Sequence, residues 1–204
     1  MKNLVIVVLV LFSLNAFSQS DTVCAGAVEY YKVLKTEGST YAWEISGGGK
    51  ALYGVDIKSD SVEIEWVNAE TMSEETVKVI ETNKYGRSGE AVVLTVFKYP
   101  VPTAIIGGSD TLFDGNTGTD KIVVTLTGTA PWNIVYNDGK TDIDITGIDQ
   151  SPFSIETRSL SNPPEQHKFT LISVKNKSGC KGNVSGVAEV TVSPPIKTSK
   201  IFHK

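Results

Sequence analysis

Few side chains in this sequence could carry out catalysis, and they are not arranged for it. The chain of 204 residues contains two Cys and two His. A cysteine nucleophile needs a base beside it. His167, however, stands at the start of an expected strand, Cys180 lies beyond the far end of that strand, and His203 falls in the C-terminal tail. The histidines also lack the spacing of metal ligands. We therefore predict no catalytic residue, no metal site, no cofactor and no enzymatic activity.

Two loops resemble ligand sites but are better explained as turns. Gly47–Lys50 looks like a phosphate-binding loop, yet it lacks that motif's first Gly and its Ser or Thr, and no helix is expected after it. Asp138, Asp142 and Asp144 share an expected hairpin in which calcium could bind. Their spacing is not that of an EF-hand loop, and Asn-Asp-Gly is a common turn sequence. We predict turns at both places.

Two tryptophans have two interpretations each, as core residues or as platforms for a ligand. Trp43 stands in a strand with alternating aromatic residues, where a Trp usually fills the space between two sheets. Trp132 follows Pro131 at the start of another expected strand. A core position is the simpler interpretation, because burying an aromatic ring stabilises a small domain strongly. Trp132 is nevertheless the candidate for stacking against a carbohydrate.

The N-terminus has the pattern of a signal peptide over residues 1–18. Lys2 precedes an apolar run from Leu4 to Leu14, and Ala16-Phe17-Ser18 has the small-x-small spacing of a cleavage site. The run is too short to cross ~30 Å of hydrocarbon comfortably. We expect cleavage before Gln19 and an exported protein, in the periplasm or at the cell surface, that does not span a membrane.

Charge and hydrophobic patterning indicate an all-β fold. The net charge of −4 argues against a nucleic-acid partner, which needs a basic surface. Short runs such as Val62–Trp66 and Ile122–Thr127 alternate apolar and polar residues, as half-buried strands do. Asn137-Asp138-Gly139 predicts a hairpin turn between two such runs. No long stretch shows helical periodicity, and about seven short strands in each ~90-residue unit are typical of a β-sandwich.

The chain divides into two similar units. Ser20–Cys24 and Ser109–Phe113 open them, and each unit closes on a Val-rich strand. Prolines, which disfavour helix and remove backbone donors, separate the units and precede the tail. We expect five segments: a signal peptide (1–18), a first β-sandwich domain (19–98), a Pro-containing linker (99–103), a second β-sandwich domain (104–192) and a basic tail (193–204).

Six short segments, three in each unit, carry a resemblance to a known family: Asp21–Cys24, Gly38–Trp43, Glu81–Gly86, Thr127–Trp132, Tyr136–Gly139 and Gly147–Phe153. They resemble the PKD-like, immunoglobulin-like repeats of surface proteins exported by Bacteroidota. The resemblance implies two tandem antiparallel β-sandwiches with a structural or binding role, and it brings no catalytic residues. Such repeats occur in adhesins and in proteins linked to gliding motility and type IX secretion.

The cysteines depart from the family's pattern. Members often have one Cys near the first strand and one in the loop before the last strand. Here the first unit keeps Cys24 but has Arg87 at the second position, and the second unit has Phe113 at the first position but keeps Cys180. In an end-to-end arrangement we expect Cys24 at the far end of its unit, ~25 Å from Cys180, and hence no bridge. Side-by-side units would allow a disulfide, which the even count of cysteines in an exported protein favours.

The functional expectation is an exported, non-catalytic binding or structural protein of the cell envelope. Its partner would be another envelope or surface protein, and an accessory role in gliding motility or type IX secretion follows from the resemblance. The alternative is a carbohydrate-binding module that uses Trp132.

Overall fold

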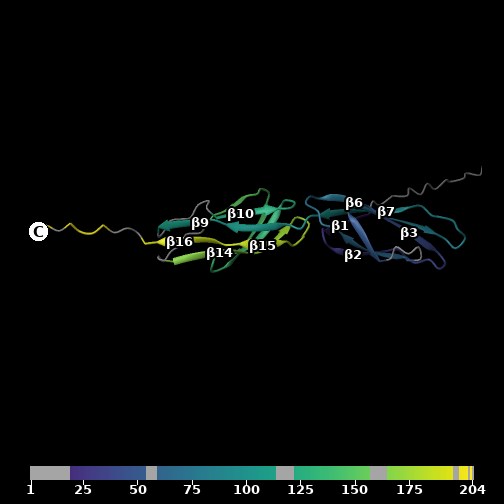
Figure 1. Ribbon diagram of the computed structural model, residues 1–204, viewed down its shortest axis with the longest axis horizontal. Coiled ribbons are helices and arrows are strands. Elements are labelled where there is room, and N and C mark those ends of the chain that lie inside the picture. The colour runs from purple at the N-terminus through teal and green to yellow at the C-terminus, as the bar shows by residue number, and fades with distance from the viewer. Residues whose placement is uncertain are drawn as a thin grey trace, which may run out of the picture.

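The described residues of the computed structural model form two lobes that lie end to end (Figure 1). They are all strand and loop, as the alternation predicts, and no helix occurs among them. The predicted signal peptide lies outside them. We call the strands β1 to β7 lobe 1 and the strands β8 to β16 lobe 2. The structure describes residues 19–53, 59–113, 122–156, 165–194, 198–201 and 203.

Lobe 1 consists of two sheets. Their strand orders are β1-β7-β6-β3 and β2-β5-β4. Strand β1 runs parallel to β7, whereas the other neighbours are antiparallel. The strands of lobe 1 are β1 (Gln19–Cys24), β2 (Val28–Lys32), β3 (Thr40–Ile45), β4 (Gly49–Tyr53), β5 (Ser61–Trp66), β6 (Ser73–Thr82) and β7 (Val92–Tyr99).

Lobe 2 repeats this plan with one more strand in each sheet among the described residues. The strand orders are β13-β10-β8-β15 and β12-β11-β14-β16-β9. Strand β9 runs parallel to β16, as β1 does to β7, and β15 runs parallel to β8. The strands of lobe 2 are β8 (Thr103–Gly107), β9 (Ser109–Phe113), β10 (Ile122–Thr127), β11 (Trp132–Asn137), β12 (Asp142–Ile148), β13 (Phe153–Ile155), β14 (Glu165–Asn176), β15 (Asn183–Gly186) and β16 (Ala188–Ser193).

Each lobe has its own hydrophobic core. In lobe 1 the alternation of β5 buries Val62, Ile64 and Trp66 between the sheets and turns Glu63 and Glu65 outward, as the sequence predicts. The Tyr31 and Trp66 rings form a T-shaped pair with 6.3 Å between their centroids. The two sheets of lobe 1 therefore pack through one small aromatic and aliphatic cluster.

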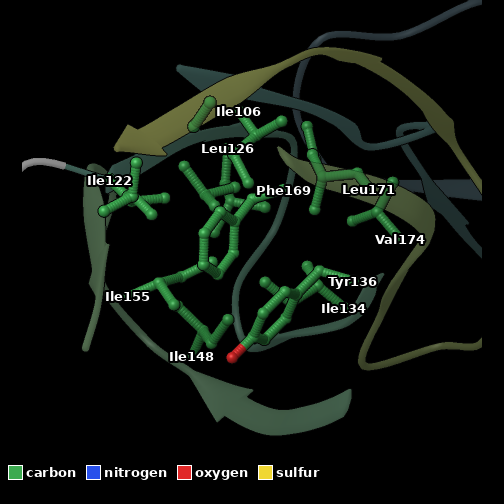
Figure 2. Packing of buried hydrophobic residues seen from close by; sticks show 14 of the residues in the cluster. Ile106, Ile122, Leu126, Ile134, Tyr136, Ile148, Ile155, Phe169, Leu171 and Val174 are labelled. Carbon is green, nitrogen blue, oxygen red and sulfur yellow. The ribbon is translucent and has the colours of Figure 1, made fainter. Parts of the chain in front are cut away.

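The core of lobe 2 is larger. Phe169 and Tyr136 stack with their ring centroids 6.4 Å apart, and aliphatic side chains from both sheets surround them (Figure 2). The predicted hairpin turn is confirmed, since β11 and β12 pair antiparallel on either side of residues 138–141. Gly139 has a φ of 90°, a conformation that favours glycine.

Candidate functional site at the junction of the two lobes

The first strand brings Cys24 to the junction of the lobes. Because β1 is parallel to β7, its last residue, Cys24, pairs with Tyr99, the last residue of lobe 1. The next residue continues this contact, since the Ala25 N–H donates to the Tyr99 carbonyl at 2.8 Å. Our expectation that an end-to-end arrangement places Cys24 at the far end of lobe 1 is wrong. Cys24 ends its strand rather than beginning it, and the six-residue strand spans about 20 Å.

On the side of lobe 2, one asparagine organises the loop that carries the second cysteine. The Asn176 side-chain oxygen accepts hydrogen bonds from the backbone N–H groups of Ser178 and Cys180, both at 3.0 Å. Its amide nitrogen donates to the carbonyl of Pro100, in the linker, at 3.2 Å. Asn176 is only 2% exposed. A buried amide with these partners fixes both the loop and the linker beside it.

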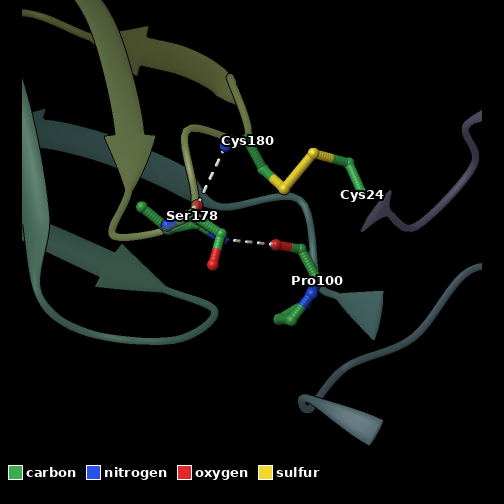
Figure 3. Close-up of a disulfide and its surroundings, with 5 residues drawn as sticks. Cys24, Pro100, Ser178 and Cys180 are labelled. Atoms are coloured by element: carbon green, nitrogen blue, oxygen red, sulfur yellow. Dashed lines mark hydrogen bonds between the residues drawn. A yellow bond between two sulfur atoms is a disulfide. The ribbon is translucent and has the colours of Figure 1, made fainter. Parts of the chain in front are cut away.

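A disulfide joins the two lobes at this point. Cys24 and Cys180 are bonded, with their Cα atoms 5.6 Å apart, a usual separation for a disulfide. The bond connects the end of β1 to the loop before β15, next to Pro100 (Figure 3). The cysteines are 156 positions apart in sequence. An end-to-end arrangement and a bridge, which we expected to exclude each other, therefore occur together.

The linker itself is bound to lobe 2. The Asn183 N–H donates to the Pro102 carbonyl at 3.2 Å. A side chain at Gly182 would meet that same carbonyl group, so only glycine fits there without a shift. The lobes are thus joined twice, by a linker with fixed hydrogen bonds and by the disulfide. Two separate connections resist the bending that a single linker would permit.

A buried ion pair lies close to the junction in lobe 1. Lys98, one residue before Tyr99, is 4% exposed and its Nζ lies 3.3 Å from Glu75. It also donates to the Gly48 carbonyl at 3.1 Å. Glu75 accepts further hydrogen bonds from the Ser46 hydroxyl at 2.5 Å and from the Gly48 N–H at 3.1 Å. The network holds the Ser46–Gly49 turn against the end of β7.

These hydrogen bonds control the ionisation of Glu75. Burial raises the pKa of its carboxyl group, but hydrogen bonds from Ser46, Ser73, Lys98 and Gly48 lower it by more. The net effect is a pKa below the ordinary value for glutamate. The carboxylate form is therefore favoured in the folded protein, which matches its ion pair with Lys98.

Trp132 is not placed as a stacking platform for a ligand. Its side chain is 6% exposed and belongs to the core of lobe 2. The indole N–H donates to the Thr127 carbonyl at 2.9 Å. Stacking on a ligand requires an exposed ring face, so we correct the sequence-based suggestion. Trp43 is half-buried against the core of lobe 1 and donates to the Ser59 carbonyl at 3.0 Å.

The acidic hairpin of lobe 2 is organised by its own turn. The Asp138 carboxylate accepts hydrogen bonds from the N–H groups of Lys140 and Thr141. Asp142 accepts one from the Asn137 amide at 2.6 Å. No group of three or more acidic, His or Cys side chains suited to a metal ion occurs in the part of the chain that the structure describes.

The structure also locates the internal repeat that the sequence indicates. In lobe 1 the Asn83 side chain accepts hydrogen bonds from the N–H groups of Tyr85 and Arg87, as Asn176 does from Ser178 and Cys180. Arg87 is thus the structural counterpart of Cys180. The recurring asparagine before a Gly-containing loop is the sequence signal that could have identified Asn176 as the organiser of its loop.

Comparison with known proteins supports the fold. No protein-family model matches the chain, and no curated protein matches it. Extracellular domains 3–5 of Drosophila OTK are similar to it at 13% identity, with a TM-score of 0.51 over 87% of this chain and 60% of theirs. An I-band fragment of titin matches at 11% identity and a TM-score of 0.48, over 87% of this chain and 63% of the fragment.

Fibronectin(III)-like modules of CbhA from Clostridium thermocellum match at 11% identity and a TM-score of 0.39, over 93% of this chain and 98% of theirs. Of the OTK and titin structures, by contrast, this chain spans less than two thirds of the length.

The protein has the fold of tandem immunoglobulin-like β-sandwich domains. Among the described residues, no helix reaches the length and apolarity that crossing a membrane would take.

Proposed function

We propose that this chain is a non-catalytic, exported binding or structural protein of the bacterial cell envelope, whose two lobes act as one rigid body. Rigid immunoglobulin-like lobes hold binding surfaces at a fixed separation and orientation. The predicted domain division, 19–98 and 104–192, belongs to this proposal, as does the signal peptide. The observation that carries it is the disulfide between Cys24 and Cys180 across the junction.

Two consequences of the disulfide support the proposal. Disulfides persist in oxidising compartments such as the periplasm and the cell surface, which fits export. The bond also engages both cysteines of the chain, so neither thiol is available as a nucleophile. Its position between the lobes, rather than within one of them, favours a role in fixing their relative orientation.

The resemblance to Bacteroidota repeats suggests a biological process in which this protein takes part. We expect an envelope or surface protein as the partner, with an accessory role in gliding motility or type IX secretion. In the source bacterium, deletion of the gene should reduce surface spreading without slowing growth in liquid. Wild-type protein should restore spreading, and a Cys24→Ser/Cys180→Ser variant should restore it less well at equal abundance. Unchanged spreading of the deletion strain would contradict this role.

The rigid-body proposal is tested by small-angle X-ray scattering on the mature protein. The oxidised protein should fit one elongated shape. The Cys24→Ser/Cys180→Ser variant should need an ensemble of bent shapes, while its circular dichroism stays that of folded strands. Identical scattering from both proteins would show that the disulfide does not restrict the junction. N-terminal sequencing of the native protein should begin at Gln19.

A further inference from the structure

The outer face of the β2-β5-β4 sheet presents two exposed tyrosines on either side of a glutamate. Tyr30 on β2 and Tyr53 on β4 both pair with Glu63 on the central strand β5. Residues that pair directly across strands share one face of a sheet. The inner face is occupied by the core residues of β5, so these three side chains lie in a row on the outside.

Both rings of this row are largely exposed. Tyr30 is 64% exposed and Tyr53 is 73% exposed, whereas Tyr31, the neighbour on the opposite face of β2, packs into the core. Adjacent strands lie ~4.8 Å apart, so two strand spacings separate the tyrosine positions by ~10 Å. That span is about the length of one disaccharide repeat in an extended β-linked hexose chain.

Charged groups lie between the two rings and beside them. Glu63 and Glu65 are half-buried by their neighbours, yet within the described part of the chain neither carboxylate has a hydrogen bond or an ion pair. A second row beside the first contains Val28, Glu65 and Lys50. The face thus combines two aromatic rings with two hydrogen-bond acceptors and one donor.

This combination fits a sugar better than a protein or a charged polymer. A hexose ring has an apolar C–H face, which packs on an aromatic ring, and a rim of hydroxyl groups, which donate to carboxylates. A protein interface of ordinary size has an apolar core depleted of charge, whereas three of the six positions in these rows are charged. The negative charges of the two glutamates would also repel an acidic polymer.

We propose that the row Tyr30–Glu63–Tyr53 binds a neutral, β-linked hexose chain that lies across the strands. Each tyrosine stacks on one of two alternate sugar rings, and Glu63 accepts hydrogen bonds from hydroxyl groups between them. The proposal rests on the proposed binding function, but it does not depend on the rigidity of the junction. It moves the carbohydrate-binding surface from Trp132, which is buried, to the outer sheet face of lobe 1.

The test is isothermal titration calorimetry of the mature protein with three β1,4-linked hexasaccharides: cellohexaose, mannohexaose and N-acetylchitohexaose. At least one of them should bind. Tyr30→Ala and Tyr53→Ala should each weaken that binding about tenfold, the effect expected for losing one stacked ring. Glu63→Gln should weaken it less, because the amide still accepts a hydrogen bond through its oxygen.

Two exposed residues elsewhere in lobe 1 provide matched controls. Tyr85 is 79% exposed on the loop between β6 and β7, and Glu70 is exposed between β5 and β6. Tyr85→Ala and Glu70→Gln should leave the affinity unchanged. All variants change exposed or half-exposed side chains, so their melting temperatures should stay close to that of the wild type.

Three results would overturn the inference. These are no binding of any of the three hexasaccharides, equal affinity in the wild type and both tyrosine variants, or a loss in only one of them, which excludes a two-ring platform. Scattering from the unliganded protein reports separately on the junction. A failure of sugar binding is therefore distinguishable from a failure of the rigid-body proposal.

Discussion

Cys24 lies beside Tyr99 in the parallel ladder of β1 and β7, so the end of the first strand and the end of lobe 1 meet at one point. The disulfide to Cys180 extends this meeting point into lobe 2. The geometry explains why each lobe has one cysteine. Cys24 lies at the end of lobe 1 where the chain passes into the linker, and Cys180 lies at the end of lobe 2 that adjoins the same linker.

The two positions at which the repeat lacks a cysteine both lie far from the junction. Arg87, the counterpart of Cys180, lies in the loop after β6, at the end of lobe 1 remote from the junction. Phe113, the counterpart of Cys24, ends β9 and pairs with Ser193 at the remote end of lobe 2. The sequence pattern that looks like two half-lost bridges is, in the structure, one complete bridge between neighbouring lobes.

Removing the disulfide should destabilise the protein and loosen the junction. For Cys24→Ser/Cys180→Ser we expect a loss of about 2–4 kcal/mol in the free energy of unfolding, because the bond closes a long loop in the unfolded chain. Urea denaturation of the variant and of the oxidised wild type measures this loss. Wild type treated with a reductant should behave like the variant, and equal stability with and without reductant would contradict the prediction.

Breaking the buried ion pair should cost far more than breaking an exposed one. Lys98→Met leaves the Glu75 carboxylate without its cation in a largely buried place, which costs about 3–5 kcal/mol. The pair between Lys78 and Glu44 provides the control, since its side chains are 34% and 72% exposed. Lys78→Met should cost less than about 1 kcal/mol. Similar losses in both variants, measured by urea denaturation, would show that the Lys98 pair is not special.

The lowered pKa of Glu75 makes part of the stability depend on pH. A carboxyl group whose pKa is lower in the folded state stabilises the fold above its unfolded pKa of about 4.3. That contribution is lost as the pH falls through the folded value. The stability difference between wild type and Glu75→Gln should therefore be full at pH 7 and shrink under acid conditions. Chemical denaturation at a series of pH values measures it, and a constant difference would refute the assignment.

Adding a methyl group at Gly182 should destabilise the junction, because the methyl group would collide with the backbone of the linker. Gly182→Ala places a Cβ against the Pro102 carbonyl, and overpacking of this kind typically costs about 1–3 kcal/mol. Gly107→Ala is the matched control, because a Cβ there meets nothing within 4 Å. Denaturation midpoints should fall for the first variant and stay or rise for the second. The reverse order would mean that the linker is not held against Gly182.

Replacing Trp132 should affect folding, not ligand binding. Trp132→Phe removes buried volume and the hydrogen bond to Thr127, with an expected loss of about 1–3 kcal/mol in stability. Thermal denaturation followed by circular dichroism measures the change. The affinity for whichever hexasaccharide binds the wild type should remain the same. Weaker sugar binding at unchanged stability would restore Trp132 as a ligand residue.

Much of the fold could be predicted from the sequence, because the alternation of apolar and polar residues shows which face of a strand is buried. Val62–Trp66 shows this clearly, with three buried residues and two glutamates outside. Strands such as β4 and β15 lack a clear alternation of apolar and polar residues. Each is short and contains glycine, so their pairing depends on neighbouring strands rather than on their own pattern.

The site was harder to predict because it depends on the direction of one strand. Whether Cys24 begins or ends β1 decides its distance from Cys180, and the local residues do not indicate it. The row of Tyr30, Glu63 and Tyr53 comes from three separate strands, and a bulge after Ala51 shifts the pairing of β4. Such a row becomes visible only when the register is known.

The disulfide also decides which part of the chain would bear tension. Pulling on β1 and β16 from outside would transmit force along β1 to Cys24, across the sulfur atoms to Cys180, and out through the last strand. Every residue between the two cysteines lies within a closed covalent ring and is excluded from that route. Under tension such a chain could lengthen only in the segments outside the ring, which include β1, β15 and β16, because the disulfide keeps the enclosed residues from being drawn out.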